Sequence, residues 1–490
     1  MSTIVNDTHC GSPERVAPER NNMPSAITFD LAIVGSGSAA FATAIEARRH
    51  KASVVMIEQG AVGGTCVNVG CVPSKALLAA ADARHVALAQ HFPGITTSAG
   101  HVDMTSLVAG KDEIVSELRR EKYVGLAELY GFRILTGVAR FIEGPALEVN
   151  GERIEATHYV IATGAAPWAP PIVGLEEVDY LTSTTAMELD RVPASLVVIG
   201  ANAVGLEQGQ LFARLGAEVT IVEALARIAP FEEPEISESL TTILGSEGIA
   251  VRTGETVREV QREGEKIVIS LDTSLGSEEL RAEAVLVATG RRPRTANLGL
   301  ESVGVTLGAR GEVVVDEELR TTNPRIFAAG DATGHPQFVY VAGRHGTVVA
   351  NNALTAAHLT VDYRNLPRVT FTSPAIASVG MTDEQANDLG IDCECRVLPF
   401  AYVPRAIVNL DTRGVAKVVA ERSTGRVLGV HLLAEGAGDA ILAAVYALDA
   451  GFTVEQLANA WTPYLTMAEA IKLTAQSFTR DVAALSCCAS

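Results

Sequence analysis

The sequence predicts an α/β protein with two Rossmann-like nucleotide-binding domains, duplicated along the chain, followed by a C-terminal α+β domain. Two observations predict the duplication: a glycine-containing turn follows a short apolar strand at 35–40 and again at 200–205. After Pro367 such turns stop, and the pattern changes to a strand meander, 369–430, and then to helices. A length of 490 residues also exceeds what one hydrophobic core supports.

The first predicted unit opens with the apolar strand Phe29–Val34. The turn after it has the dinucleotide fingerprint with alanine in the third glycine position, and it reads Gly35-Ser36-Gly37-Ser38-Ala39-Ala40. Gly35 permits a tight turn, and Gly37 lets the backbone approach a pyrophosphate at the N-terminus of the following helix. The next strand, 53–57, ends at Glu58, whose carboxylate can bind a ribose diol.

The same organisation recurs downstream. The strand 196–199 leads into a turn in which asparagine replaces the middle glycine, Gly200-Ala201-Asn202-Ala203-Val204-Gly205. The strand 218–222 then ends at Glu223. Each half also has an alanine-threonine-glycine turn after an apolar strand, at Ala162-Thr163-Gly164 and Ala288-Thr289-Gly290. The repeat predicts one bound dinucleotide and one exchanging dinucleotide.

A cysteine pair follows the first fingerprint by about one βαβ unit. The segment reads Gly63-Gly64-Thr65-Cys66-Val67-Asn68-Val69-Gly70-Cys71-Val72-Pro73-Ser74-Lys75, a glycine-rich turn that leads into the helical run 76–81. Cys66 and Cys71 can close a small disulfide ring, and a reducible disulfide beside a dinucleotide indicates that electrons pass through sulfur. The alternative is a metal clip, but zinc sites usually have shorter cysteine spacings and need two further ligands.

This segment resembles the redox-disulfide motif of the flavin-dependent pyridine nucleotide–disulfide oxidoreductases, and the likeness extends over about residues 28–490. The resemblance implies FAD in the first domain, NADPH or NADH in the second, and Asp331 on the ribityl chain of the flavin. The residues expected at the two cofactors are Gly35, Gly37, Ala39, Ala40, Glu58, Gly64, Thr65, Lys75, Ala139, Thr163, Gly164, Asp331, Val339, Gly200, Asn202, Gly205, Glu223, Arg227 and Gly290.

The resemblance also suggests domain boundaries. Residues 1–26 are expected to form a disordered tail, and the FAD-binding domain is expected to be discontinuous, with its parts at 27–160 and 290–365. The NAD(P)H-binding domain is expected at 161–289 and the dimerisation domain at 366–480. A mobile C-terminal tail is expected at 481–490.

Catalytic roles follow from the family. Cys71 would be the flavin-facing, charge-transfer thiol and Cys66 the outward, interchange thiol, with electrons arriving from the nicotinamide through the flavin. Glycines and a helix N-terminus lower thiol pKa values and favour the thiolate. Lys75, one turn along, adds positive charge and would pair with Glu207 beside the flavin.

One departure from the family concerns the electron acceptor. Members that reduce organic disulfides have a histidine five residues before a glutamate near the C-terminus. Here Glu469 is kept, but Tyr464 stands in the histidine position. The unperturbed pKa of tyrosine is about 10, so its hydroxyl cannot shuttle protons at neutral pH as imidazole does. This difference counts against the reduction of glutathione disulfide or lipoamide.

The adjacent pair Cys487-Cys488 gives positive evidence for another acceptor. Soft thiolates select soft metal ions, and a mobile tail with two thiolates could take Hg(II) from small thiols. It would pass the ion to Cys66 and Cys71 by ligand exchange, as in the family members that reduce Hg(II) to elemental mercury and so detoxify it. In these members Tyr123 also matches a tyrosine near the metal.

The resemblance implies a homodimer in which Tyr464, Glu469, Cys487 and Cys488 act on the partner's disulfide. Two alternatives stay open: an NAD(P)H-dependent disulfide reductase of the same fold, and a non-catalytic flavoprotein subunit. For the nicotinamide, Glu223 should repel a 2′-phosphate and favour NADH, whereas the family generally uses NADPH and Arg227 could bind a phosphate. Acceptance of NADH is therefore expected.

Composition also argues against nucleic-acid-binding, membrane-spanning and secreted classes of protein. The net charge of −19 disfavours nucleic acid, and no apolar run is long enough to span a bilayer. The polar start, 1–24, lacks a signal core, and seven cysteines suggest functional thiols in a reducing compartment, so a cytoplasmic location is expected. With only Cys10 near the start, an N-terminal metal-binding module is not expected. Cys393 and Cys395 would share one face of a strand, where incidental thiols are favoured over a metal or redox role.

Overall fold

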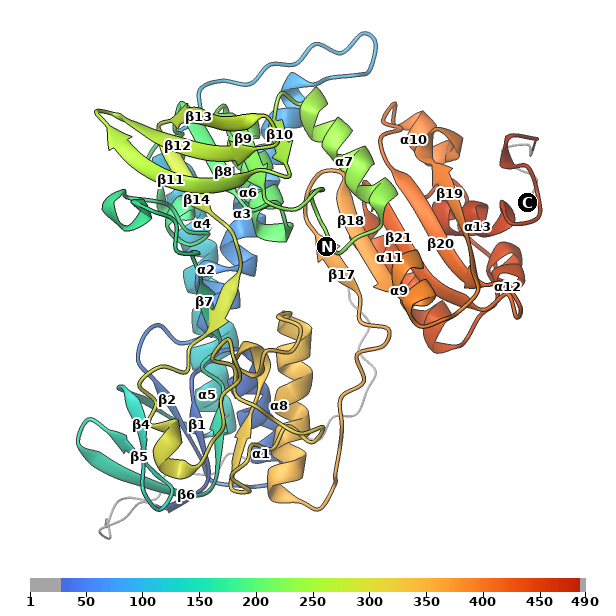
Figure 1. Cartoon of the computed structure of the whole chain (residues 1–490). Coiled ribbons are helices and arrows are strands. Elements are labelled where there is room, and N and C mark those ends of the chain that lie inside the picture. Colours follow the sequence, from blue (N-terminus) through green and yellow to red (C-terminus); the bar gives the residue numbers. More distant parts are fainter. Residues whose placement is uncertain (1–27, 485–490) are drawn as a thin grey trace, which may run out of the picture.

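The computed structural model describes residues 28–484, which form three parts around three main sheets (Figure 1). In the view of Figure 1 the first sheet lies at the bottom, the second at the upper left and the third at the right. Within 28–484, no helix is long and apolar enough to cross a membrane. The expectation for the tail 1–26 lies outside the described residues, and so does most of the expected tail 481–490, of which Val482–Ala484 form a short 3-10 turn, η7.

The first sheet has seven strands in the order β3-β2-β1-β6-β5-β4, with β16 also paired to β6. Five of them run parallel: β1 (Thr28–Val34), β2 (Val54–Glu58), β3 (Arg133–Thr136), β6 (Glu152–Ile161) and β16 (Ile326–Ala328). The antiparallel pair β4 (Ala139–Ile142) and β5 (Ala146–Val149) extends one edge. β16 therefore joins the strands of the first third of the chain, although it lies about 165 residues after β6.

Two helices from distant parts of the sequence pack together beside this sheet. They are α1 (Ser38–Arg49) and α8 (Val339–Leu354). A Cβ at Gly346 would lie 2.4 Å from the carbonyl oxygen of Ala39, so glycine is what allows the two backbones to come this close. The contact holds the start of α1, where the first fingerprint lies, against the middle of α8.

The second sheet has four parallel strands in the order β10-β9-β8-β14. These strands are β8 (Ser195–Ile199), β9 (Glu218–Glu223), β10 (Ala250–Thr253) and β14 (Ala284–Val287). Helices α6 (Ala203–Leu215) and α7 (Pro234–Ser246) accompany them, and an antiparallel sheet covers one side, made of β11 (Thr256–Glu263), β12 (Lys266–Thr273) and β13 (Gly276–Ala282). A short ribbon of β7 (Ala165–Pro167) and β15 (Arg291–Pro293) forms the two crossings between the first and second parts.

A run of helices links the first two parts along their length. It comprises α2 (Gly64–Val69), α3 (Cys71–Leu88), α4 (Met104–Arg119), a π-helical turn, η1 (Arg120–Val124), and α5 (Gly125–Tyr130). The middle of α3 packs on α6, and Leu77, Leu78 and Ala81 share a core with Leu206 and Leu211. The helix thus begins near the first sheet and ends against the second (Figure 1).

The third part has a five-stranded antiparallel sheet in the order β17-β18-β21-β20-β19. Its strands are β17 (Arg368–Thr370), β18 (Ala375–Gly380), β19 (Cys393–Pro399), β20 (Val415–Glu421) and β21 (Val427–Ala434). The helices α11 (Ala437–Asp449), α12 (Val454–Asn459) and α13 (Glu469–Gln476) follow.

The expected strand meander over 369–430 is only partly right. Two helices interrupt it, α9 (Asp383–Asp388) and α10 (Pro404–Val408), and the last strand continues to Ala434. Thr382 and Gln385 form a capping box that starts α9. Because α9 follows β18, the chain crosses the sheet and β19 takes the far edge instead of pairing with β18.

Candidate functional site

The thiol-bearing segment is helical from its start, rather than a turn before a helix at residue 76. Cys66 lies in α2, and Cys71 is the first residue of α3, since Gly70 breaks the two helices apart. Pro73 fits the first turn of α3 because the backbone N–H it lacks would have no partner there. Cys71 therefore lies at a helix N-terminus, where the helix dipole favours a negative charge.

Glycines bring this segment against the first fingerprint. Gly63 and Gly64 have φ of 111° and 66°, a region that favours glycine. A Cβ at Gly64 would lie 2.5 Å from the Cα of Gly37, so the two backbones touch where these side chains are absent. Cys66 and Cys71 consequently line the same cavity as Gly37.

Both cysteines are free thiols, and they interact closely. A hydrogen bond from Cys66 lowers the pKa of Cys71 to about 7, against the opposing effect of burial and with help from the charge of Lys75. The same hydrogen bond, together with burial, raises the pKa of Cys66. At neutral pH the arrangement favours a Cys71 thiolate that accepts a hydrogen bond from the Cys66 thiol.

Lys75 is held by a buried acid. Its Nζ lies 2.6 Å from Oε2 of Glu207 on α6, and it stands 4.4 Å above the ring of Phe371. The other oxygen of Glu207 accepts a hydrogen bond from the backbone N–H of Phe371 at 2.9 Å. Residues from all three parts of the fold thus fix the ammonium group near the thiols.

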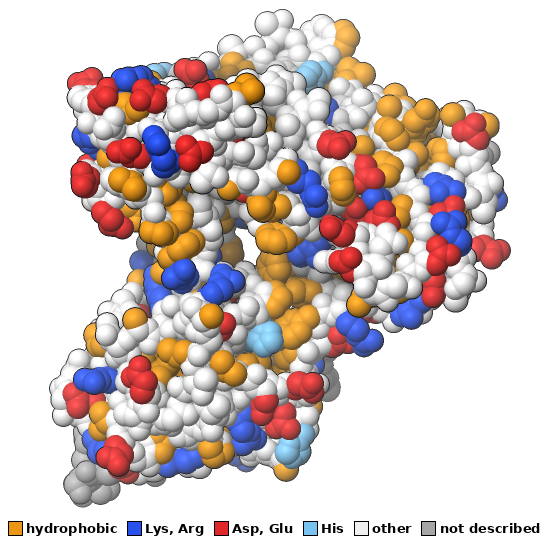
Figure 2. Space-filling view, viewed as in Figure 1, with side chains coloured by type: hydrophobic (Ala, Val, Ile, Leu, Met, Phe, Trp, Pro, Cys, Tyr) orange, Lys and Arg blue, Asp and Glu red, His pale blue; other side chains and the backbone are white. Residues whose placement is uncertain are grey.

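A cavity of about 540 Å³ opens between the first and second parts, where Figure 2 shows the surface hollowed. Its lining contains some of the residues expected at the cofactors, namely Gly37, Ala39, Thr65, Lys75, Gly164, Asp331 and Val339. The backbone at Gly35, Ala40 and Gly64 lies directly behind this lining: a Cβ at Gly35 would meet the Ala162 carbonyl oxygen at 2.3 Å.

Two polar groups suit a ligand with hydroxyl groups: Asp331 lines this cavity, and Thr163 lies between the lining residues Ala162 and Gly164. Burial raises the pKa of Asp331, although Arg291 opposes the shift. The hydroxyl of Thr163 is buried and has no hydrogen-bond partner in the protein. Donors and acceptors on a bound dinucleotide would satisfy both groups. The donor set and the close backbone at the fingerprint therefore fit FAD.

Glu58 and Ala139 lie farther from the thiols. Glu58 ends β2, and its two oxygens accept hydrogen bonds from the Ser36 hydroxyl at 2.6 Å and the Gly60 N–H at 2.7 Å. This places the carboxylate beside the fingerprint turn, as a ribose ligand requires. Ala139 begins β4 and is buried.

The second fingerprint has the same backbone geometry. Gly200 has φ of 101°. A Cβ at Gly205 would lie 1.9 Å from the carbonyl oxygen of Gly200. Glu223 ends β9, is 9% exposed, and accepts hydrogen bonds from the N–H groups of Ala201 at 2.7 Å and Leu225 at 2.9 Å. Two further expected residues, Asn202 and Gly290, lie at the N-cap of α6 and in the turn after β14.

The Arg227 side chain is held by the protein's own backbone. Its guanidinium donates to the carbonyl oxygens of Pro230 at 2.9 Å and Glu232 at 3.2 Å. Its Nε is buried and has no hydrogen-bond partner. Glu223 is therefore the charged group that the second fingerprint presents at the end of β9.

Tyr123 lies near the thiols. It belongs to the π-helical turn η1, packs edge-on against Phe41 with ring centroids 4.9 Å apart, and hydrogen-bonds Ser38. Burial raises its pKa, and the nearby Cys66 and Cys71 act in the same direction. The hydroxyl is thus held in its neutral form at the edge of the thiol pair.

The third part does not bring its expected residues to this cavity within one chain. Glu469 begins α13 and accepts a hydrogen bond from the Leu465 N–H at 2.8 Å, while Tyr464 is half-exposed before it. Neither residue lines the cavity. Cys487 and Cys488 lie outside the described residues.

The structure adds two residues that the sequence reading missed. Arg291 lines the cavity and donates to the Ala165 carbonyl oxygen at 2.5 Å. It also interacts electrostatically with Asp331 and Cys71. Its position directly after the turn ending at Gly290 was the available signal. Phe371 had no such signal, because its role depends on the third part folding against Lys75.

Comparisons with known proteins agree with this geometry. Residues 29–346 match the family model described as pyridine nucleotide-disulphide oxidoreductase, and residues 366–475 match the dimerisation domain of that family. The chain is 59% identical to a mercuric reductase of Streptomyces lividans, over 94% of this chain and 98% of the relative. It is 48% identical to a mercuric reductase of Staphylococcus aureus, over 94% of this chain and 84% of the relative.

A solved structure is similar as well. The HOCl-induced flavoprotein disulfide reductase RclA from Escherichia coli, in its Cu(II) complex, superposes with a TM-score of 0.83 at 30% identity, covering 93% of this chain and all of the other. Sequence and structure thus match over both the nucleotide-binding parts and the third part. The chain belongs to the pyridine nucleotide-disulphide oxidoreductase family.

Proposed function

We propose that the chain reduces Hg(II) to elemental mercury with electrons from NAD(P)H, and so detoxifies mercury. The observation that supports it most is the dithiol Cys66/Cys71 beside the fingerprint cavity, with a thiolate stabilised at Cys71. Relatives that share up to 59% of their residues with the chain are named mercuric reductases. The overall reaction balances as NADPH and Hg(II) giving NADP⁺, one proton and Hg(0).

The first part would hold FAD through the backbone of its fingerprint, the Glu58 carboxylate and the buried Asp331 and Thr163. When bound, FAD supplies a two-electron relay between the nicotinamide and the thiols. Lys75 keeps positive charge next to this place because Glu207 orients it. The Cys71 thiolate and Cys66 then serve as the soft ligands for Hg(II).

Tyr123 would stand beside the bound ion and offer a phenolic hydroxyl to it. Tyr464 and Glu469 would come from the other chain of a homodimer, since they do not reach the cavity of their own chain. The family's dimerisation domain supports this pairing. Cys487 and Cys488 would take Hg(II) from small thiols and pass it to Cys66 and Cys71, so that the ion always keeps a sulfur ligand.

For the nicotinamide, we propose that NADH is accepted unusually well. Glu223 presents a carboxylate at the end of β9, and Arg227 is occupied by backbone carbonyl oxygens. A 2′-phosphate would meet the Glu223 carboxylate, while the Arg227 nitrogen held by those carbonyl oxygens would not be available to offset the repulsion. Steady-state kinetics should show that Glu223→Ala shifts preference toward NADPH. A strong NADPH preference in the parent chain that persists in Glu223→Ala would refute this assignment.

The function is tested by following NADPH oxidation with different acceptors. The holoenzyme should turn over with Hg(II) in excess thiol and release volatile mercury, but should be slow with glutathione disulfide and lipoamide. Faster turnover with either disulfide would favour the alternative, a disulfide reductase. No turnover with any of the three would favour a non-catalytic flavoprotein. A variant with Cys487→Ala and Cys488→Ala should be impaired most when Hg(II) arrives with bulky dithiols.

A further inference from the structure

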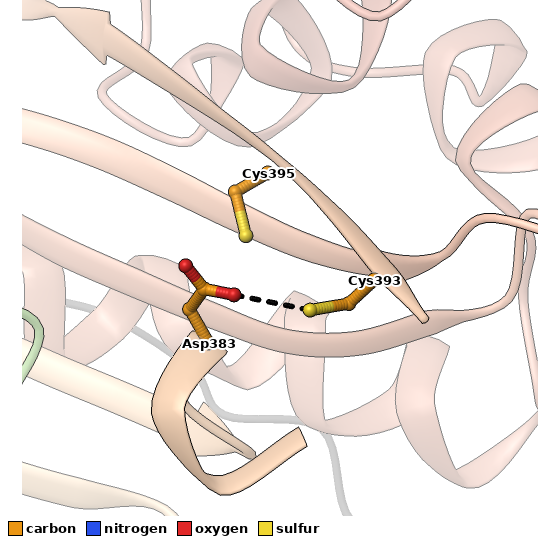
Figure 3. Close-up of side chains that lie close together, drawn as sticks. All are labelled: Asp383, Cys393 and Cys395. Atoms are coloured by element: carbon orange, nitrogen blue, oxygen red, sulfur yellow. Dashed lines mark hydrogen bonds between the residues drawn. The ribbon is translucent and has the colours of Figure 1, made fainter. Parts of the chain in front are cut away.

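A second group of potential metal ligands, two thiols and one carboxylate, lies in the third part, away from the cavity. Asp383 on α9 and Cys393 and Cys395 on β19 place their ligand atoms within 4.8 Å of one another, and all three are half-buried (Figure 3). Among residues 28–484, this is the group of three or more such side chains close enough to hold one ion. None of the three lines the cavity with Cys66 and Cys71.

The local structure explains why the two thiols face one acid. Side chains two residues apart on a strand point to the same face, so Cys393 and Cys395 both reach toward α9. Asp383 is the first residue of α9, directly after the N-cap residue Thr382. The Cys393 thiol donates to Oδ1 of Asp383 at 3.0 Å, and both cysteines are free.

Neighbouring groups complete the surroundings. Asn387, one turn along α9, donates from Nδ2 to Oδ1 of Asp383 at 3.0 Å, which orients the carboxylate. The nearest lysine, Lys417, is buried and paired with Glu233 at 2.8 Å and Glu235 at 3.0 Å. Its charge is therefore balanced by two acids that are not part of the group, and it does not block a cation.

We propose that Asp383, Cys393 and Cys395 form a second binding site for a thiophilic divalent cation of the Zn(II), Cd(II) and Hg(II) class. Two sulfurs at about 2.3 Å and one carboxylate oxygen at about 2.0 Å are the usual ligand distances for zinc, and half-exposure leaves a fourth position for water. Binding replaces the two thiol protons, so each ion bound as a dithiolate releases two protons to solvent. The site is independent of the proposed reaction at Cys66 and Cys71.

The test uses the full-chain holoenzyme with the other five cysteines replaced by serine, namely Cys10, Cys66, Cys71, Cys487 and Cys488. Titration with Cd(II) should give ultraviolet thiolate-to-metal absorbance that saturates at one ion per chain. Adding Cys393→Ser and Cys395→Ser should abolish it. Absence of a saturating signal, or an equal signal in the doubly substituted protein, would overturn the proposal.

A matched pair of substitutions at acidic residues distinguishes the loss of a metal ligand from misfolding. Asp383→Asn should weaken Cd(II) binding by about tenfold or more, because it removes a charged ligand while keeping the shape. Asp388→Asn should leave binding unchanged, since Asp388 is an exposed acid at the end of the same helix, α9, and is not one of the three grouped side chains. Bound-flavin absorbance and circular dichroism confirm the fold of each variant. Equal affinities in the two variants would show that Asp383 is not a ligand.

Competition identifies which ion the site prefers. Hg(II), and Zn(II) in excess because it is less soft than Cd(II), are each added to the Cd(II)-loaded protein, and either should displace Cd(II), measured as the cadmium that no longer elutes with the protein on gel filtration. Failure of both ions to displace Cd(II) would contradict a site for this class. In the otherwise native chain, Cys393→Ser with Cys395→Ser should keep NADPH-dependent Hg(II) reduction. A loss of that activity would contradict a site separate from the reaction.

Discussion

At Cys71, opposing effects on one thiol can be compared directly. Burial disfavours the thiolate, whereas a hydrogen bond from Cys66 and the Lys75 ammonium favour it. The favourable effects are larger, and the pKa falls to about 7. The same pairing raises the pKa of Cys66, so one thiolate is shared by the pair and carried mainly by Cys71.

Lys75→Met should raise the pKa of Cys71, because it removes the cation that stabilises the thiolate. Alkylation of Cys71 in the reduced holoenzyme at pH 7 should slow roughly fivefold, which corresponds to a pKa higher by about one. Peptide mass spectrometry after timed iodoacetamide treatment measures the rate. Lys51→Met, at an exposed residue after α1, is the control and should not change it. An unchanged rate in Lys75→Met would show that Lys75 has no electrostatic effect.

At the scale of elements, the break between α2 and α3 determines where the thiols lie. Gly63 and Gly64 turn the chain back onto the first fingerprint, and Gly70 separates the two helices. A continuous helix over 64–88 would carry Cys66 and Cys71 on nearly opposite faces, since five residues span about 500°. The glycines therefore convert a helical segment into a paired thiol site.

Gly64→Ala should destabilise the protein and weaken its hold on FAD. The added Cβ would lie 2.5 Å from the Cα of Gly37, and φ of 66° is unfavourable for alanine. Such strain costs about 1–3 kcal/mol. Thermal unfolding and the flavin content of purified protein measure the two effects. Gly110→Ala in α4 has open space around it and should be neutral or slightly stabilising. Equal behaviour of the two variants would contradict the close backbone contact.

At the scale of the whole molecule, one ionic network joins α3, the second part and the third part. Arg214 on α6 donates two hydrogen bonds to Glu247 after α7, at 3.0 and 2.7 Å, and also pairs with Asp82 on α3. Arg413, before β20, adds a bond to Glu247 at 2.9 Å. The side chains of Arg214 and Glu247 are only 3% and 7% exposed. Removing either partner would therefore leave a buried charge without its counter-charge.

Glu247→Gln should destabilise the protein by about 3 kcal/mol at pH 7, because it leaves buried guanidinium groups without their charge partner. Burial alone would raise the pKa of Glu247, but Arg214 and His85 hold it below its usual value. The carboxylate therefore contributes stability above the unfolded pKa of about 4.3, and this contribution is lost as pH falls through the lower folded pKa.

Thermal unfolding of the parent and Glu247→Gln across pH tests this sign. The gap in midpoint should be largest near neutral pH and should shrink below about pH 4.3. Glu238→Gln, at an exposed residue on α7, is the control, and its unfolding midpoint should equal that of the parent at every pH. A gap that stays constant down to the acid limit would show that the charge of Glu247 is not what stabilises the network.

Mixed dimers should recover activity that the separate variants lack, if each active site is built from two chains. One chain carries Cys66→Ala and the other carries Cys487→Ala with Cys488→Ala. In a mixed dimer, one site combines an intact Cys66 with an intact tail, so about half of the native activity per dimer is expected. Turnover with Hg(II) bound to bulky dithiols measures it. Mixed dimers that do no better than the separate variants would place both cysteine pairs in one chain's site.

The sequence by itself determined the local chemistry of this protein. Each fingerprint turn lies within about 25 positions of its strand-end acid, Glu58 or Glu223, and the two thiols lie five positions apart. Such short-range patterns specify turns and strand ends directly, because glycine geometry and strand alternation are local properties. The pairing of Lys75 with Glu207 came from likeness to a family rather than from local pattern.

Only the tertiary structure decided which distant residues meet. Phe371 contacts Lys75 and Arg291 approaches Cys71 because separate parts of the chain fold together, and no sequence period encodes such contacts. In the same way, α9 intervenes after β18, sends β19 to the sheet edge and brings Asp383 to Cys393 and Cys395. Burial and charge at these meeting points exist only once the parts are packed, which is why they determine pKa values that the sequence could not supply.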